Sequence, residues 1–454
     1  MKSLNLSKPN ILNLLVCIFP LTFILGTLFV NIIILLISIL GILFYREKLF
    51  NIEKNNLLVF LSFFFLLLIV STYFENIGSD NNHFLKSFLY LRYFIFLLVI
   101  RYMILKGDLN FSQFFLTCLI LSSLVAADVI FQYFIGVNIL GFEATPHNRP
   151  GLFRTEAVAG GYIQKFLVLG VFGIPMFLNK NKSKIIFYLA LVLIVGFLGI
   201  IFSGNRMPVI LFIFFILLSS LVLGFKKFKL IKLFFLIFIF SLFTFLINKS
   251  ERLNTSYLGF YAGLTELSEV LPEIGRDYPE LEEYKNSGKP FHETEGRRFI
   301  ENYKMLPNYT GHTSLYITSI QLFIESPIIG RGIKSFRNTC KEVWHLPNRT
   351  CQLHPHHIYL EILNYTGALG FLIIFITLLV LFIKNINKYH LKNLGNKKNL
   401  NLIFYAVAFA LLIEFFPFRS HGSFFSTNTS SYIFLLIGMF FGLYDLQVKN
   451  FSKK

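Results

Sequence analysis

The sequence predicts an all-α polytopic membrane protein with about twelve transmembrane helices and a large, partly helical loop between helices 9 and 10. Hydrophobic residues make up 55% of the 454 residues and charged residues only 15%, which is too apolar for a soluble globule. Apolar runs of about 20 residues, the length that crosses a bilayer, follow one another along the chain. Lysines gather in alternate connecting segments, as the positive-inside rule describes for membrane proteins.

The predicted spans form a group of nine and a group of three, separated by one polar insertion. In chain order they are 11–27, 28–46, 55–74, 84–105, 111–134, 160–178, 184–202, 206–224, 229–248, 357–383, 401–417 and 430–447. The first two form one long apolar run, which we divide near Asn31. We therefore expect residues 1–248 to hold helices 1–9, 249–356 to form a loop domain, and 357–454 to hold helices 10–12 and a cytoplasmic tail.

The net charge of +18 reflects membrane topology and does not indicate a nucleic-acid partner. With the N-terminus placed in the cytoplasm, the cytoplasmic segments carry lysine clusters within 180–184, 226–229 and 384–398. The opposite short loops hold arginines instead, namely Arg149, Arg154, Arg206 and Arg419. Both termini are then cytoplasmic, and the loop domain faces outward.

One helix is predicted inside the loop domain. From Ser314 to Ile324 the apolar residues form an uneven amphipathic face, and the helix should stop at Pro327. The rest of the domain carries clustered carboxylates and turn-forming residues. A loop of this length is usually either functional or disordered.

Two of the four cysteines, Cys340 and Cys351, lie in the outward segment, where oxidising conditions allow them to pair. A disulfide here would close a short loop upstream of several histidines and contribute about 3 kcal/mol in the chain-entropy description. Free thiols and a metal site shared with those histidines are the alternatives. The spacing matches no common zinc pattern, so no metal is expected.

Three histidines, His354, His356 and His357, stand where the loop domain ends and the tenth predicted span begins. Histidine titrates near neutrality, so these rings can accept or donate a proton at working pH. His356 opens the pattern H-H-x9-G-x-x-G, which ends at Gly367 and Gly370. On a helix, Gly367 lets the backbone approach a neighbour and so fixes the orientation of the histidine. The competing interpretation is a histidine that only satisfies a helix N-terminus.

Arginines on the outward side are candidate ligands for an anionic substrate. Arg206 follows the residues Ser-Gly-Asn in the hairpin between spans seven and eight. Its planar guanidinium can hold two diphosphate oxygens at once, although an arginine at a span end can equally be a snorkelling anchor. Arg149 and Arg154 lie in the outward loop 135–159, where the alternative is simple solvation.

Arg92, Asp128 and Glu414 are among the ionisable residues inside predicted spans. Such residues are costly in a bilayer and tend to face the bundle interior. We expect Arg92 and Asp128 to form a structural ion pair, with a proton relay as the alternative. The Walker A, dinucleotide-binding, HExxH and GxSxG motifs are all missing.

Together these motifs resemble the O-antigen ligase/polymerase superfamily of bacterial envelope enzymes, which has a large periplasmic loop before a late span. The family motif H-[NSQ]-x9-G-x-x-G matches at His356, with His357 in place of Asn, Ser or Gln. The segment SPIIGRGIKSF fits the family pattern P-[LI]-x-G-x-G-x-x-x-F, and SGNR supplies the arginine that opens a span. The family often has an arginine fifteen residues before the proline of the P-[LI]-x-G-x-G-x-x-x-F pattern, here Pro327, and His312 stands there instead.

The resemblance implies glycan transfer from undecaprenyl diphosphate to an acceptor hydroxyl on the periplasmic face, with lipid A–core as the expected acceptor and with inversion. His356 is the implied general base. The substrate-binding residues at motif positions are Arg206, His312 and His357, and Arg154 and Arg149 join them as candidates because of their place in the outward loop. No cofactor is expected, and the partners are the lipid-linked donor, the acceptor and membrane lipids of the bacterial inner membrane.

Two alternatives stay open. A polymerase of the same superfamily would extend the growing glycan by the same chemistry. A lipid-linked oligosaccharide flippase, which belongs to a different class, needs a charged cavity through the bilayer centre, and Arg92, Asp128 and Glu414 lining one such cavity would favour it.

Overall fold

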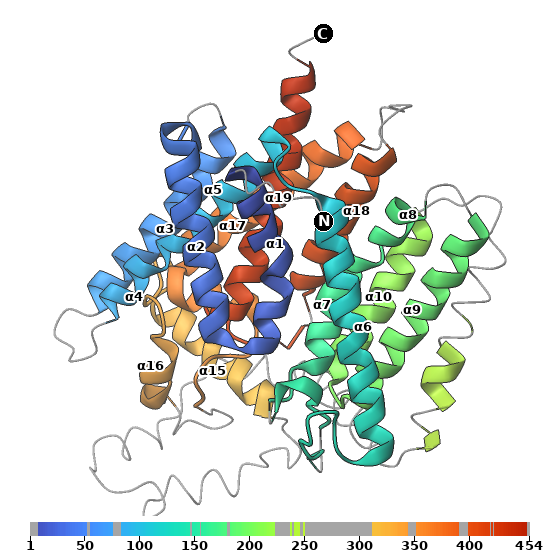
Figure 1. The fold of residues 1–454 in the computed structure, drawn as a ribbon. Coiled ribbons are helices and arrows are strands. Elements are labelled where there is room, and N and C mark those ends of the chain that lie inside the picture. The colour runs from blue at the N-terminus through green and yellow to red at the C-terminus, as the bar shows by residue number, and fades with distance from the viewer. Residues whose placement is uncertain are drawn as a thin grey trace, which may run out of the picture.

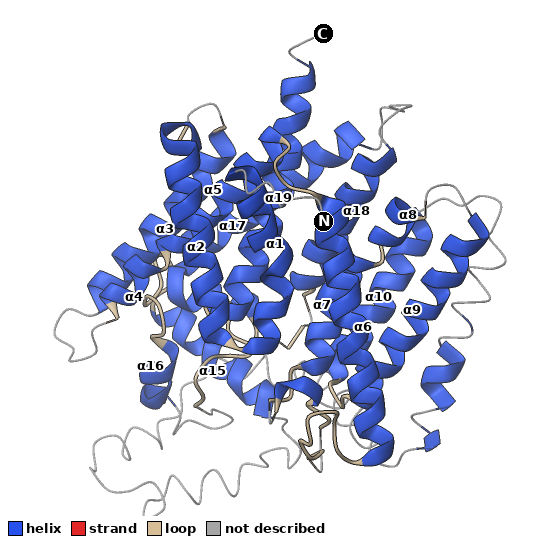
Figure 2. Cartoon of the chain, in the orientation of Figure 1, coloured by secondary structure: helices blue, strands red, loops and turns tan. Residues whose placement is uncertain are grey.

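The structure, a computed structural model, describes residues 8–51, 55–75, 83–145, 148–154, 156–178, 182–222, 237, 240–245, 248–249, 311–343, 351–389, 398–417, 419–420 and 422–451. These residues are mostly helical (Figure 2) and form no strand, only two isolated β-bridges, Val137 with Glu143 and His357 with Ser420. Of the expected ninth span at 229–248, only residues 237, 240–245 and 248 are described, and most of the loop domain lies outside the described residues.

Each predicted span within the described residues corresponds to one helix or to a pair of consecutive helices. The elements are α1 (Lys8–Leu25), α2 (Thr27–Tyr45), η1 (Arg46–Leu49), α3 (Asn56–Glu75), α4 (Phe84–Leu89), α5 (Leu91–Lys106), α6 (Phe111–Ile135), η2 (Gly151–Phe153), α7 (Ala159–Gly170), α8 (Gly173–Phe177), α9 (Lys182–Phe202), α10 (Arg206–Val222), α15 (Gly311–Glu325), α16 (Phe336–Val343), α17 (Ile358–Tyr389), α18 (Lys398–Glu414) and α19 (Thr427–Phe451). Within the described part of the chain, 8 helical segments are long and apolar enough to cross a membrane, and three shorter apolar helices accompany them. The protein is therefore a multi-pass membrane protein, and the count of about twelve spans stays a prediction.

The last helix, α19, runs through the middle of the bundle (Figure 1), and 83% of its apolar stretch is buried. It packs closely against α5, because a Cβ added at Gly438 would come within 2.8 Å of the Leu97 carbonyl oxygen. An ion pair between Arg101 of α5 and Asp445 of α19 lies in the same interface. The small glycine surface lets the two helices approach, as is common between membrane helices.

The long apolar run at the N-terminus divides at Gly26, five residues before the predicted position near Asn31. Gly26 has φ 112, a conformation that only glycine adopts without strain. Asn31 lies inside α2, where its side-chain oxygen accepts a hydrogen bond from Arg92 at 3.1 Å. The turn between α1 and α2 therefore forms at the one residue suited to it.

The predicted ion pair between Arg92 and Asp128 is wrong. Arg92 donates to Asn31 and, at 2.9 Å, to the hydroxyl of Tyr93. Asp128 accepts from the backbone N–H of Ile139 at 3.0 Å and so folds the loop after α6 back onto that helix. Arg92 and Asp128 therefore have separate hydrogen-bond partners.

The helix predicted over 314–324 is confirmed as α15, which ends at Glu325, two residues before Pro327. The segment after it docks on a kink in α17 at Gly367, where φ is 63. The backbone N–H of Ala368 donates to the Pro327 carbonyl at 2.8 Å, and that of Gly332 donates to the Tyr365 carbonyl at 2.9 Å. The two glycine-containing motifs thus bind each other through backbone hydrogen bonds.

Candidate functional site

A cavity of about 1150 Å³ opens between the Gly26 turn, loop 140–158, the first turns of α7 and α10, and the segment 419–429. It exceeds the roughly 300–1,000 Å³ of pockets that hold drug-sized ligands, so a sugar diphosphate fits by volume. Three helices, α7, α10 and α19, contribute residues of their N-terminal turns to the lining. The dipoles of these helix N-termini favour a negatively charged ligand there.

The lining is strongly cationic. Four basic side chains and one carboxylate reach it, and these are Arg154, Lys165, Arg206, Arg419 and Glu156. The basic residues come from four separate elements, so only the fold brings them together. A concave surface with an excess of one charge attracts ligands of the opposite sign more strongly than a flat one does.

Arg206 is the first residue of α10, and the hairpin before it is firmly tied to α7. The Asn205 side-chain oxygen accepts from the Gly160 N–H at 3.1 Å, and the Asn205 amide donates to the Ala157 carbonyl at 2.8 Å. A Cβ at Gly160 would come within 2.3 Å of the Ser203 hydroxyl, so the two turns fit only with glycine there. This contact places the exposed Arg206 at the cavity lining.

The two arginines of loop 135–159 take different positions. Arg154 is exposed, lines the cavity and has φ 58, an uncommon backbone conformation outside glycine. Arg149 does not line it; its guanidinium lies 5.1 Å from the centroid of the Tyr133 ring, and its backbone N–H donates to the Ser203 carbonyl. The structure therefore brings Arg154 and Arg206 to one cavity, whereas Arg149 is not part of its lining.

Glu414 holds two of the cations in place. Its fully buried carboxylate lies 2.8 Å from Arg419 and 3.6 Å from Lys165. Lys165 also sits 5.1 Å from the ring centroid of Tyr432, a residue of the central helix α19. A carboxylate between two cations lowers their mutual repulsion and fixes their geometry before any ligand arrives.

His357 uses both ring nitrogens inside the protein. Nε2 donates to the Pro417 carbonyl at 2.8 Å, and Nδ1 accepts from the Leu360 N–H at 3.5 Å, which caps the start of α17. Burial lowers the pKa of His357, while the hydrogen bond to the Pro417 carbonyl acts in the opposite direction. His357 is therefore a neutral ring that positions the start of α17.

His356 is half-buried and has φ 56, in the left-handed region that residues other than glycine rarely adopt. Its ring lies 4.1 Å, centroid to centroid, from the ring of His354. Such strain persists only where the surroundings impose it, and it is common at functional sites. His356 is not among the residues that line the cavity.

The start of α17 nevertheless contacts a segment that lines the cavity. His357 forms a β-bridge with Ser420, which lines the cavity. One turn later, the buried Glu361 accepts from the Ser423 hydroxyl and the Phe424 N–H, both at 2.5 Å. Segment 419–424 is thus anchored at both ends to the helix that the histidines introduce, so the motif and the cavity are mechanically coupled.

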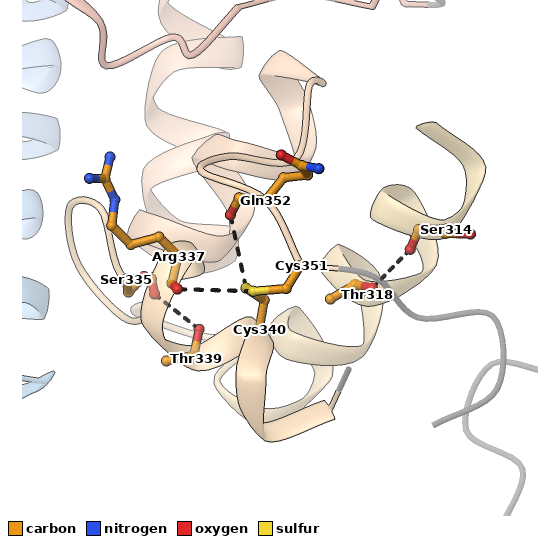
Figure 3. Close-up of a disulfide and its surroundings, with 8 residues drawn as sticks. All are labelled: Ser314, Thr318, Ser335, Arg337, Thr339, Cys340, Cys351 and Gln352. Atoms are coloured by element: carbon orange, nitrogen blue, oxygen red, sulfur yellow. Dashed lines mark hydrogen bonds between the residues drawn. A yellow bond between two sulfur atoms is a disulfide. The ribbon is translucent and has the colours of Figure 1, made fainter. Parts of the chain in front are cut away.

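A disulfide joins Cys340 of α16 to Cys351, with the Cα atoms 5.3 Å apart (Figure 3). Cys351 lies three residues before His354, so the bridge fixes the chain that enters the histidine motif to α16. Cys17 and Cys118 are buried and free. Within the described residues no group of three or more metal-binding side chains is assembled.

His312 is the second residue of α15, and its side chain lies outside the described residues. Sequence reasoning missed Lys165 and the role of Glu414 as its partner. Lys165 is a charged residue within the span predicted at 160–178, and a charge in a span is itself a signal of function. The sequence therefore contained a signal for Lys165. Its pairing with Glu414 of α18 depends on how the helices pack and could be identified only in the structure.

The family model described as O-Antigen ligase matches residues 189–375. Residues 189–375 are thus similar to an O-antigen ligase domain. The match includes the hairpin that ends at Arg206 and the whole histidine motif, and it spans less than half of the 454 residues. Lys165, Arg154 and the 419–429 segment complete the cavity from outside it. No curated protein matches the chain.

The match supports an enzyme of the ligase and polymerase type that acts on glycans, with a lipid-linked glycan and a polysaccharide acceptor as partners. The cation-lined cavity and the histidine motif are the features of this chain on which such chemistry can be built. Among the charged side chains that line the cavity in the described chain, Arg206 is the one that lies in the matched segment.

Proposed function

We propose that this protein is an inverting glycosyltransferase that moves a glycan from undecaprenyl diphosphate to an acceptor hydroxyl at the periplasmic face of the bacterial inner membrane. The observation that carries the proposal is the convergence of four cations and three helix N-termini on one cavity beside the histidine motif. Lipid A–core is the proposed acceptor, which makes the protein an O-antigen ligase. The lysine distribution supports cytoplasmic termini and a periplasmic segment at 249–356.

The charge of the cavity suits a diphosphate diester, which carries about two negative charges at neutral pH. Four cations line the cavity, and the carboxylates Glu156 and Glu414 offset two of them, which leaves two positive charges for the ligand. Arg206 and Arg154 would grip the phosphate oxygens through their guanidinium forks. Lys165 and Arg419, held by Glu414, would supply charge from the opposite side.

The chemistry needs one base and one stabilised leaving group. In the proposed reaction His356 takes the proton of the acceptor hydroxyl, whose oxygen bonds to the anomeric carbon from the face opposite the diphosphate. The bond from that carbon to the diphosphate oxygen breaks, and its electron pair leaves with undecaprenyl diphosphate. The cavity cations stabilise this developing charge, and no metal is needed for that step.

The alternatives differ in how this structure supports them. A polymerase would use the same base and cations with a growing glycan as acceptor. For the flippase, the favourable observation would be Arg92, Asp128 and Glu414 lining one cavity, and none of the three lines this one. The transferase is therefore the better-supported function.

The test is His356→Ala in cells whose only copy of the protein is the variant. We expect glycan on the acceptor to fall by about 10²–10⁴-fold, the usual contribution of a general base, at unchanged protein level. Unlinked donor should accumulate in the periplasmic leaflet, measured by its accessibility to added glycosidase. Normal product would rule out His356 as the base, and donor held in the cytoplasmic leaflet would indicate a flippase.

A further inference from the structure

A second cluster of positive charge lies outside the cavity, where α4 and the start of α5 meet the segment that enters α16. We call it the basic patch, and its members are His83, Lys86, Arg92, Lys334 and Arg337. None of them lines the cavity. The patch forms because α3 holds both sides: α4 packs against α3, and the Thr72 hydroxyl of α3 accepts from the N–H of Ile333, next to Lys334.

These charges lie close to one another. Lys86 Nζ is 3.0 Å from His83 Nδ1. Lys334, half-buried and at φ 63, lies within electrostatic range of Lys86, Arg92 and Arg337, and burial together with these charges lowers the pKa of Lys334. The Arg337 side chain points away from the disulfide (Figure 3). Like charges gathered in this way repel one another, so an anion bound among them would be stabilised.

Within the described residues, no member of the patch forms an ion pair. Arg331, only three residues before Lys334, shows the contrast, since it pairs with Glu325 at 3.0 Å. Glu361 is within range of Arg337, but its buried carboxylate already accepts from Ser423 and Phe424.

Three nitrogens in the patch are shielded from solvent and have no hydrogen-bond partner in the described chain. They are Nε of Arg92, Nε of Arg337 and Nε2 of His83. Unmade buried donors are costly, so this surface is built for a ligand rich in acceptor oxygens.

We propose that the basic patch binds a phosphate group of the acceptor lipid. This inference rests on the proposed function, in which two lipid substrates must be held at once and the donor diphosphate occupies the cavity. The Cys340–Cys351 bridge connects the patch to the base, because Arg337 lies on α16, and α16 is joined through Cys351 to the chain that enters His354–His357. A phosphate held at Arg337 therefore sets how the acceptor hydroxyls approach His356.

The experiment uses the full-length protein in phosphatidylcholine nanodiscs and two probes, lipid A with its phosphates and the same lipid A after phosphatase treatment. Binding is measured by surface plasmon resonance. The wild type should bind the phosphorylated form about tenfold more tightly, because charge-assisted hydrogen bonds contribute only when phosphate is present. Arg337→Gln and Lys334→Gln should each remove most of that difference and leave binding of the dephosphorylated form unchanged.

Lys341→Gln is the matched control, since it removes one exposed charge from the same helix and should leave the preference intact. Equal binding of both probes by the wild type would overturn the proposal, as would loss of both probes in Arg337→Gln. Full displacement of phosphorylated lipid A by phosphatidylglycerol at equal phosphate content would assign the patch to bulk phospholipid instead, and would also overturn it.

A third probe, undecaprenyl diphosphate, separates this proposal from the one before it. Its binding should fall in Arg206→Gln and stay unchanged in Arg337→Gln. If Arg206→Gln has no effect on it while the patch variants still lose the phosphate preference, the donor site is wrong and the basic patch stands.

Discussion

The hairpin that ends at Arg206 and the segment from Pro327 to Gly332 both match family patterns, yet they serve the fold in different ways. The hairpin delivers a charged side chain to a cavity. The segment delivers backbone, because its peptide groups bond to the kink of α17 and its glycines leave room for that contact. A Cβ at Gly330 would come within 2.5 Å of the Gly367 nitrogen. A short motif can therefore mark either a reacting group or a close fit, and a mutation tells the two apart.

The largest effect on folding should come from Gly367→Ala. The added Cβ would lie 2.1 Å from the Ile328 carbonyl oxygen at a φ of 63, so both the contact and the backbone conformation are lost. We expect a loss of about 3 kcal/mol in the free energy of unfolding. Thermal unfolding in detergent micelles measures it, with Gly161→Ala as the control, since nothing lies within 4 Å of that position. Equal melting temperatures for the two variants would remove the structural role of Gly367.

Arg206→Lys tests the other side of the comparison. Lysine keeps the charge but cannot grip two phosphate oxygens, so transfer should fall about tenfold to a hundredfold while the melting temperature stays unchanged. Arg149→Lys is the matched control, because Arg149 does not line the cavity. Glycan attached to the acceptor is the measurement. If Lys substitutes well at 206 and poorly at 149, Arg206 is an anchor and the cavity is not the donor site.

His357→Asn should have the smallest effect. An asparagine can accept from the Leu360 N–H and donate to a carbonyl, as His357 does, which explains why the family pattern has Asn, Ser or Gln there. Activity should stay within about twofold of the wild type. Because a lowered pKa keeps His357 neutral above its unperturbed value of about 6.5, the pH profile above that value should also be unchanged. If the variant no longer loses activity at low pH as the wild type does, His357 is the titrating base in place of His356.

Hydropathy located the long apolar helices within the described residues, because membrane spans must be long and apolar. The span predicted at 111–134, for example, is α6, Phe111–Ile135. The breaks at Gly26 and Gly367 were less predictable, since a glycine in an apolar run is compatible with a straight helix until its neighbours are known. The apolar pattern shows that a residue lies in a span but does not identify the residue it contacts on another helix. For this reason the expected pairing of Asp128 with Arg92 is wrong.

The candidate site was partly readable for the same reason. Arg154 and Arg206 stood out as outward arginines, and both line the cavity. Lys165 did not, because a single charge in an apolar run was counted as part of the span. Its ion pair with Glu414 joins α7 to α18, and contacts between helices so distant in sequence depend on how the bundle packs. Candidate side chains on the outward loops could be predicted from the topology, whereas the contacts of side chains inside the bundle could be known only from the packing of its helices.

The bridge between Cys340 and Cys351 adds a requirement that the membrane spans do not have. Insertion of the helices needs only the apolar spans, whereas the bridge needs a thiol oxidant, which in the proposed topology is met only after residues 340–351 have crossed the membrane. In that topology, a chain whose helices are already inserted still needs an oxidant before the entry to its histidine motif is tied to α16.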